Sequence, residues 1–347
     1  FPLAMTHSVP GNLIGTVEGL PDKVLHGGMN EKYCYISDVT IRTSDVYLPS
    51  VPTRIDGRVF FPTGRWRSYL SNIDIELLLK EGGKIEKVHE THVFEPFYDL
   101  VDYALDIYER RKNSNNDFEK VVYKLLLNSL YGKFAESNAK DTLHINPSAE
   151  ILERLTRDNL LFPGVWLETI LVPIQHAHVP ISTHITALAR RSLFEFLTLT
   201  NDFHYCDTDG FSTGDEFQTG KELGQLKLEK IIRNGRYVVP KVYRIDGKKL
   251  NEKGEWEEVT MVKAKGFSLG SNKKVAIARF EELVAGREIY VERMTRIREM
   301  FRKGHATPSE TLVKKVLRGK MIGKRFMYPD GETRPWNFEE IKKKLRK

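Results

Sequence analysis

Two aspartates separated by one residue stand inside an apolar stretch, and this feature most constrains the local fold. The segment from Phe203 to Ser212 reads FHYCDTDGFS. Apolar residues flank a cluster of turn formers, which predicts a β-hairpin with Asp207 and Asp209 at its bend. Side chains at i and i+2 of an extended chain share a face, so the carboxylates repel and favour a bound Mg²⁺ ion. An ordinary polar turn uses the same residue types, so the pair alone leaves both readings open.

A predicted helix from Asp117 to about Phe134 carries a second set of polar residues. Its stripe consists of Lys120, Lys124, Asn128 and Tyr131, which recur at i, i+4, i+8 and i+11. Ammonium groups bind triphosphates, and an aromatic ring stacks on a base. We expect the rest of the circumference to be buried; it carries Phe118, Val121, Val122, Leu125 and Leu126. A helix that merely turns its polar side to solvent shows the same spacing, so the stripe alone leaves both interpretations open.

A third, weaker signal is Lys241-Val242-Tyr243 on a predicted strand. By the two-residue period of a strand, the ammonium and the phenol share one face and together suit a nucleic-acid backbone.

Charge is distributed unevenly along the 347 residues, whose net charge is +7. Residues 296–347 hold 16 Lys/Arg against 6 Asp/Glu, and the rest of the chain is slightly acidic. A basic end suits a polyanionic partner, although a solvated lysine-rich helix is equally basic. Two cysteines, Cys34 and Cys206, exclude a disulfide framework and favour a reducing compartment. No apolar run is long enough to span a bilayer.

The order of predicted elements indicates an α+β fold rather than a doubly wound sheet. Residues 1–66 are predicted to be extended or irregular, and a helix capped by Ser71 and Asp74 ends at Gly82. Asp246-Gly247 predicts a hairpin turn. Predicted helices cover 96–112, 117–134, 148–156 and 181–200, and the region after residue 272. Predicted strands cover 85–94, 203–212, 226–229, 237–245 and 259–263.

Taken together, these motifs resemble the family B DNA polymerases, in particular the viral and plasmid branch that includes protein-primed enzymes. The run from Lys124 to Gly132 is similar to the fingers motif KxxxNSxYG, and Tyr205 to Asp209 to the palm motif YxDTD. Residues 241–243 resemble the KxY motif, and residues 1–5 the end of the motif DxxSL[YF]PxxM. The order agrees throughout, and four ordered motifs are far more specific than any one.

The resemblance implies a role for each matching residue. Asp207 and Asp209 are the expected catalytic and metal-binding carboxylates, with Mg²⁺, or Mn²⁺ in its place. The nucleotide-binding residues would be Phe1, Lys112, Lys120, Lys124, Asn128 and Tyr131, with Phe1 packed below the sugar. The primer and template contacts would be Tyr205, Lys241, Tyr243, Lys263 and Lys265.

The resemblance also implies a palm-fingers-thumb architecture with an antiparallel palm sheet and a helical-hairpin fingers subdomain. The expected boundaries are 1–95 for the first palm part, with an insertion at about 10–60, then 96–135 for the fingers, 136–172 for a second insertion, 173–270 for the second palm part and 271–347 for the thumb and basic C-terminal region. The aspartate of the first palm motif would stand five residues before Phe1. We therefore expect this aspartate and an exonuclease portion upstream, either in the same chain or as a separate chain.

The predicted function is template-directed DNA synthesis from a primer 3′-hydroxyl by two-metal nucleotidyl transfer, replicating a viral or mobile-element genome. The expected partners are primer-template DNA, deoxynucleoside triphosphates and a priming terminal protein, with no membrane. The expected place is the host cytoplasm, or the mitochondrion for a linear organellar plasmid. Two alternatives remain open: a nucleic-acid-binding fragment that is catalytically incomplete, and a primer-independent polymerase-primase of the same family.

Overall fold

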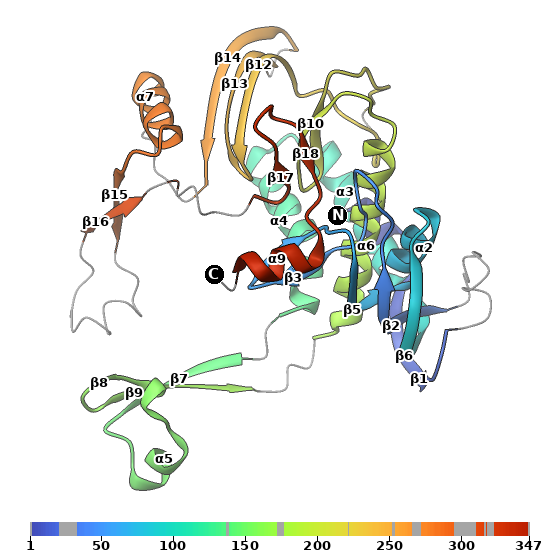
Figure 1. The fold of residues 1–347 in the computed structure, drawn as a ribbon, viewed down its shortest axis with the longest axis vertical. Coiled ribbons are helices and arrows are strands. Elements are labelled where there is room, and N and C mark those ends of the chain that lie inside the picture. Colours follow the sequence, from blue (N-terminus) through green and yellow to red (C-terminus); the bar gives the residue numbers. More distant parts are fainter. Residues whose placement is uncertain are drawn as a thin grey trace.

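The chain forms two groups of antiparallel strands with helices between them (Figure 1). The computed structural model describes residues 2–20, 33–136, 139–171, 177–220, 222–251, 254–265, 272–294, 310–315, 317 and 323–345. Phe1, which belongs to the first predicted motif, lies outside the described residues.

The first sheet has the order β1-β6-β2-β5, and all its pairings are antiparallel. Its strands are β1 (Val9–Val17), β2 (Cys34–Arg42), β5 (Arg65–Ser71) and β6 (Lys84–Phe97). A short hairpin of β3 (Thr53–Ile55) and β4 (Arg58–Phe60) precedes β5. The helix α2 (Asn72–Lys80) begins at Ser71, whose side chain accepts from the Asp74 amide in the predicted capping box. Its inner face packs Ile75 and Leu78 on the central strand β2.

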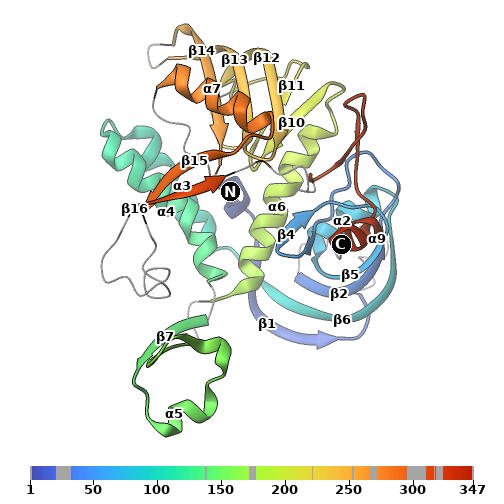
Figure 2. The same ribbon diagram turned by 60° about the vertical axis from the view of Figure 1, so that its left-hand side comes forward.

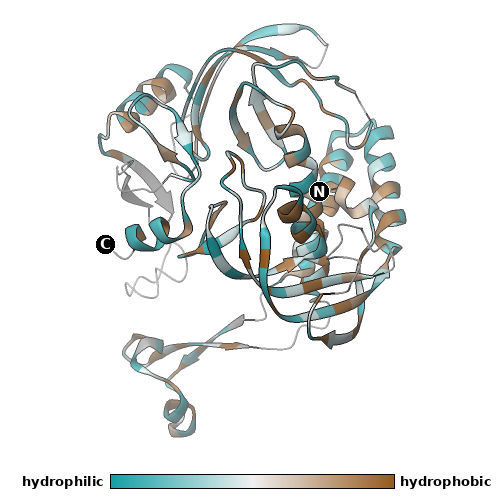
Figure 3. Ribbon diagram, turned by 45° about the vertical axis from the view of Figure 1, so that its right-hand side comes forward, coloured by the Kyte–Doolittle hydropathy of each residue, from teal (hydrophilic) through white to brown (hydrophobic). Residues whose placement is uncertain are grey.

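Two helices, α3 (Asp99–Asn113) and α4 (Asp117–Phe134), form the predicted hairpin. The turn between them ends at Asn116, whose side-chain oxygen caps α4 by accepting from the Phe118 amide at 2.9 Å. The long helix α6 (Val179–Leu197) runs between this hairpin and the first sheet (Figure 2). Ile185 on α6, Leu127 on α4 and Met5 on the short helix η1 (Leu3–Thr6) meet in one fully buried cluster. Figure 3 shows hydrophobic residues gathered around this N-terminal helix.

Residues 139–171 form a small unit that stands away from the rest of the chain in Figures 1 and 2. The elements are β7 (Ala139–Ile145), α5 (Ala149–Arg154), η2 (Arg157–Asn159), β8 (Leu160–Phe162) and β9 (Val165–Leu171). The short helix was expected, but the sequence reading missed the sheet, whose order is β7-β9-β8. Pro163-Gly164 makes the β8–β9 turn, with Gly164 at φ +81°, so what looks like one interrupted apolar run is two strands.

The second group of strands begins with the hairpin of β10 (Phe203–Asp207) and β11 (Gly210–Thr213). A three-stranded sheet follows, with β12 (Lys230–Val239), β13 (Val242–Leu250) and β14 (Trp256–Ala264) in sequence order. The helix α7 (Lys273–Val284) buries Phe280 and Leu283 against Val242 of this sheet.

Three expectations for this sheet are wrong. The predicted strand 237–245 is two strands, with the chain reversing at Pro240-Lys241. Asp246-Gly247 lies inside β13 instead of at a turn. The glycine is needed there because a side chain would come within 2.0 Å of the Ile231 carbonyl oxygen on β12. The predicted strand 226–229 is absent, and Leu226 makes only an isolated bridge with Thr219.

The C-terminal region contains strands as well as helices, so the expectation of an entirely helical end is wrong. Its elements are β15 (Ile289–Met294), β16 (Glu310–Lys315), β17 (Phe326–Met327), β18 (Thr333–Arg334) and α9 (Phe338–Leu345). The end of the chain returns to the first group of strands. Trp336 and Ile341 are buried with Phe60 of β4, and the Phe338 ring stacks on Trp66 at 5.3 Å.

Candidate active site

The β10–β11 hairpin places both predicted aspartates at its bend, as the sequence indicated. Asp207 pairs with Gly210, and the Asp209 amide donates to the Asp207 carbonyl oxygen at 2.9 Å. Thr208 at the tip has φ +67°, a left-handed conformation that costs about 1–2 kcal/mol for a residue with a side chain. The fold therefore holds a tight and slightly strained turn at this position.

The two aspartates have different surroundings. Asp207 is about one-third exposed, and its two carboxylate oxygens accept from the Lys241 ammonium at 2.7 and 2.8 Å. The Thr208 hydroxyl donates to the same carboxylate at 3.1 Å. Asp209 is exposed, and its carboxylate makes no hydrogen bond or ion pair with the described residues. Asp209 is thus the carboxylate that is more open to a ligand.

Lys241 is fixed through its backbone as well as its side chain. Its amide donates to the Tyr205 hydroxyl at 2.9 Å, and its carbonyl accepts from the Lys265 amide at 3.0 Å. It lies in the β12–β13 turn at φ +63°, so the prediction that Lys241 and Tyr243 share a face of one strand is wrong. The turn nevertheless brings both residues to one site, because its geometry aims the ammonium at Asp207.

Three tyrosines pack together behind this ion pair. Tyr205 stacks on Tyr237 with centroids 4.7 Å apart, and Tyr243 lies 5.4 Å from Tyr205 at a tilt of 58°. The Tyr237 hydroxyl forms a hydrogen bond of 2.7 Å with the Ser212 hydroxyl. Burial raises the pKa of Tyr205 and of Tyr243, so both phenols stay neutral near pH 7. Tyr237 was not identified from the sequence, because no motif or spacing distinguishes it.

A pocket of about 350 Å³ opens beside the ion pair. It brings together five of the predicted residues, and it is lined by Asp207, Lys241, Tyr243, Lys263, Ala264 and Lys265. Lys263 pairs with Tyr243 across the β13–β14 ladder. Three ammonium groups against one carboxylate give the pocket a net positive charge, which suits a phosphate group.

The polar stripe of α4 lies largely in solvent. Lys124 and Asn128 are exposed, whereas Tyr131 is partly buried against the core. Lys120 forms an ion pair of 3.3 Å with Asp117, one turn earlier. Among the described residues, no hydrogen bond or ion pair joins Lys120, Lys124 or Asn128 to Asp207 or Asp209. Its placement beside the aspartates remains a prediction from the resemblance.

The expectation that α4 buries its most apolar side is wrong. Phe118, Val121 and Leu125 have 74%, 63% and 65% of their surface exposed. The buried residue is Leu127, around which four partly buried side chains pack: Tyr123, Leu130, Tyr131 and Phe134. The C-terminal half of α4 packs against α6 and η1. These contacts, and not the local hydrophobicity of the helix, decide which of its faces is buried.

Lys112, at the end of α3, contacts a different part of the chain from the stripe. Its ammonium lies 3.2 and 3.1 Å from the two carboxylate oxygens of Glu222, in the loop between β11 and β12. Both side chains are substantially exposed, so the pair is weak. It links the helical hairpin to the segment that follows the aspartate turn.

The aspartate pair fits a hard divalent cation only as part of a larger ligand set. Mg²⁺ keeps several waters and takes one or two carboxylates plus substrate phosphates. Asp209 offers exposed oxygens of this kind, and the positive charge of the lysine-lined pocket suits phosphates. Among the described residues no group of three or more His, Cys, Asp or Glu side chains could hold a metal ion. None of the described helices is long and apolar enough to cross a membrane.

Comparison with known proteins shows which proteins this chain resembles. A family model described as DNA polymerase type B, organellar and viral, matches residues 1–161. A probable DNA polymerase of Neurospora intermedia is 27% identical over 296 residues, which cover 77% of this chain and 30% of that protein. The DNA polymerase of Bacillus phage Nf is 30% identical over 246 residues, 61% of this chain and 38% of that protein. The chain thus spans well under half the length of these relatives.

The fold agrees with this result. Phi29 DNA polymerase, solved with primer-template DNA and incoming nucleotide, superimposes with a TM-score of 0.67. The match covers 91% of this chain and 56% of that chain at 18% identity, so it is evidence about the fold alone. The predicted α+β polymerase fold with antiparallel sheets is confirmed. Over residues 1–161 the chain is similar to the type B DNA polymerases of the organellar and viral kind, and its relatives are likewise named DNA polymerases.

Proposed function

We propose that this chain carries the polymerising centre of a template-directed DNA polymerase. The observation that supports it most is the pocket beside Asp207, which brings residues of the YxDTD and KxY motifs together with Lys263 and Lys265. A pocket that joins acidic and basic groups can bind both a metal ion and a nucleic-acid phosphate. The family match supports the same activity.

In this proposal the primer 3′-hydroxyl attacks the α-phosphate of a deoxynucleoside triphosphate, and pyrophosphate leaves. Divalent metal ions, Mg²⁺ first and Mn²⁺ as a substitute, activate the hydroxyl and neutralise the leaving phosphates when bound. Asp209 supplies carboxylate oxygens to them, and Asp207 completes the acidic turn. The positive pocket holds the primer strand through Lys241, Lys263 and Lys265, with the Tyr205 and Tyr243 rings behind them.

The helical hairpin is proposed to bind the incoming nucleotide. The exposed Lys124, helped by Lys112 and Lys120, would contact the triphosphate. Asn128 and Tyr131 would form the nucleotide pocket, and Phe1 would exclude a 2′-hydroxyl. Lys112 must then exchange Glu222 for phosphate oxygens, which an exposed ion pair permits. We assign residues 1–95 and 173–270 to the palm, 96–135 to the fingers, and 271–347 to the thumb and basic end.

The partners proposed are primer-template DNA and deoxynucleoside triphosphates, by analogy with the Phi29 complex. A priming terminal protein and an exonuclease portion, in cis or as a separate chain, complete the proposed system. The source is a virus or a mobile element. The site of action is the host cytoplasm, or the mitochondrion for an organellar plasmid.

Asp209→Asn in the full natural protein tests the catalytic assignment. We expect Mg²⁺-dependent incorporation to fall below detection while primer-template binding is retained, because the variant keeps the turn and removes the open carboxylate. Asp56→Asn is the matched control, since Asp56, like Asp209, is an exposed aspartate in a hairpin turn, and asparagine tolerates its positive φ.

Undiminished synthesis by Asp209→Asn would refute the site. DNA binding by the unsubstituted protein without any incorporation would instead support the catalytically incomplete binding fragment. Synthesis on a template without a primer would support the polymerase-primase alternative.

A further inference from the structure

Two adjacent cations near the end of the chain are held by neutral groups. The Arg325 guanidinium donates to the Tyr47 carbonyl oxygen at 2.8 Å and to the Thr333 hydroxyl at 3.0 Å. The Lys324 ammonium donates to the Val59 carbonyl oxygen and lies 5.1 Å from the centroid of the Phe60 ring. Neither side chain forms an ion pair within the part of the chain that the structure describes. Their positive charge is therefore uncompensated.

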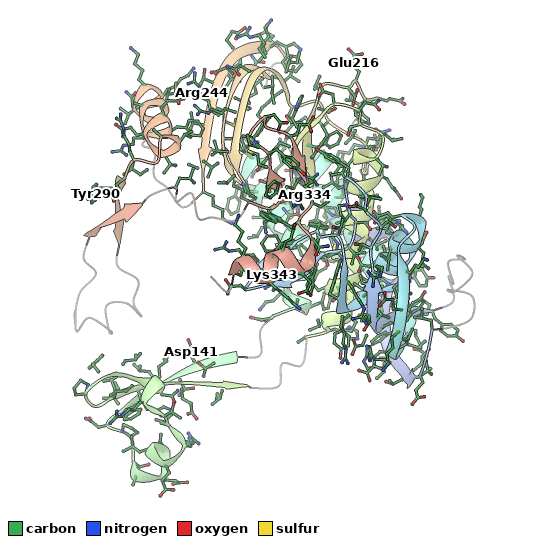
Figure 4. All side chains as sticks on the ribbon, in the orientation of Figure 1. Asp141, Glu216, Arg244, Tyr290, Arg334 and Lys343 are labelled. Carbon is green, nitrogen blue, oxygen red and sulfur yellow. The ribbon has the colours of Figure 1, made fainter. Side chains whose placement is uncertain are left out.

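Arg334 on the neighbouring strand β18 shows the contrasting arrangement. Its guanidinium makes two parallel hydrogen bonds to Glu340, at 2.9 and 3.0 Å, and lies 4.5 Å from the Phe326 centroid. Figure 4 labels Arg334 on the strand β18. Burial lowers the pKa of Arg325, whereas the hydrogen-bonded Glu340 raises that of Arg334. Since desolvating an unpaired cation is unfavourable, Arg325 is the one of the two that would gain from an anion.

Arg325 also packs on an aromatic ring and helps to fix its position. Its guanidinium lies over the Tyr47 ring at 4.3 Å, and the Tyr47 hydroxyl is 3.2 Å from the Thr333 hydroxyl. The ring is fixed at its face and at its hydroxyl, yet 55% of the residue surface is exposed. Because the guanidinium covers one face, the exposed area includes the opposite face. A rigid, half-exposed ring beside an unpaired cation combines the two elements that bind an unpaired nucleotide.

This cation–ring pair lies beside the catalytic strand. Burial shifts the pKa of both groups most, but the Arg325 guanidinium is close enough to the Cys206 thiol for each to have a small effect on the other's pKa. Cys206 directly precedes Asp207 on β10, so the cation–ring pair is close to the hairpin that carries the two aspartates.

We propose that Tyr47 and Arg325 form a binding site for single-stranded nucleic acid, with a base on the Tyr47 ring and a phosphate on the Arg325 guanidinium. The occupant is the unpaired template ahead of the primer terminus, so the inference rests on the proposed polymerase function. A duplex does not fit this site, because its bases are stacked on each other and leave no face for the ring. An acidic peptide would use the cation but not the ring.

The test compares Arg325→Gln with Arg334→Gln in the full natural protein. Binding of fluorescent primer-template DNA is measured between low and moderate salt, with a 5′ template overhang and with a blunt end. We expect Arg325→Gln to weaken overhang binding about 10-fold and to lower the salt slope by about 0.7, the value for one phosphate contact to a single strand. Arg334→Gln should leave both unchanged, and blunt duplex should bind all variants alike.

Two further variants separate the charge from the ring. Arg325→Lys should restore the salt slope, because it keeps the charge even if the fork of hydrogen bonds is lost. Tyr47→Leu should weaken overhang binding about 5- to 100-fold without changing the slope, as expected for loss of one base stack. Equal losses for Arg325→Gln and Arg334→Gln, or for overhang and blunt DNA, would overturn the site. If Asp209→Asn shows no catalytic role while these binding differences persist, the polymerase proposal fails and the binding site stands.

Discussion

Lys241 and Lys124, each predicted to act on phosphates, are held in opposite ways. Lys241 is bound at its amide by Tyr205, at its carbonyl by Lys265 and at its ammonium by Asp207. Lys124 is exposed on α4, and its ammonium makes no ion pair with the described residues. A lysine held on three sides suits a group that stays in place, such as a primer strand. A free lysine on a helical hairpin suits a ligand that arrives and leaves in each cycle.

The largest effect is expected from removing the fixed lysine. Lys241→Met should lower the rate of single-nucleotide incorporation about 10²- to 10³-fold, comparable with removing one preorganised donor from an active site. The variant also leaves Asp207 without its cation. Lys249→Met, on the exposed end of β13, is the control and should retain its rate. Equal rates for the two variants would show that the ordered position of Lys241 has no functional value.

The helix α6, which packs against the helical hairpin, should give the protein a pH-dependent stability through His184. His184 on α6 is 1% exposed, and neither ring nitrogen has a partner among the described residues. Burial lowers its pKa to about 4, from an ordinary value of 6.5. Since the unfolded chain takes up the proton first, the His184 contribution is complete above pH 6.5 and is lost as the pH falls toward 4, amounting to roughly 3 kcal/mol. Between pH 7 and pH 5, denaturant unfolding should show about 2 kcal/mol of this loss, because pH 5 is still above the folded pKa, and His184→Leu should reduce the difference.

The free lysine should contribute mainly to nucleotide affinity. Lys124→Ala should raise the apparent KM for deoxynucleotides about 10- to 100-fold, which matches one charge-assisted hydrogen bond. Steady-state kinetics on a fixed primer-template measure it, with Lys133→Ala on the same helix as the control. A loss of template binding with unchanged KM would contradict the assignment and make the two lysines functionally alike.

The smallest effect is expected on the exposed apolar side of α4. Leu125→Gln should change the free energy of unfolding by no more than about 0.5 kcal/mol, as for other surface sites. Leu127→Ala, two residues away, should destabilise by about 2–5 kcal/mol because Leu127 is fully buried. Denaturant unfolding of both variants compares them. A large loss for Leu125→Gln would show that this side is covered in the natural protein.

Local signals in the sequence predicted much of the first half of the fold. Ser71 and Asp74 predicted the capped start of α2, and the predicted helix from Asp117 to about Phe134 agrees with the bounds of α4. The aspartate turn followed from residue types alone. The second half was predicted less well, in part because the β12–β13 turn at Pro240-Lys241 contains no glycine. Lys241 reverses the chain at positive φ although lysine disfavours that conformation, and Gly247 marks a close approach of two backbones instead of a turn.

The sequence by itself determined the chemical groups and the order in which they occur: the paired carboxylates, the lysines, the tyrosines and the family motifs. Only the tertiary structure decided which of them meet. It placed Lys241 on Asp207 and left Asp209 open, it exposed the apolar side of α4, and it brought Arg325 from the end of the chain onto Tyr47. The reason is physical. A pattern of residues specifies local conformation, whereas ion pairs and stacked rings between distant segments depend on how the whole chain packs.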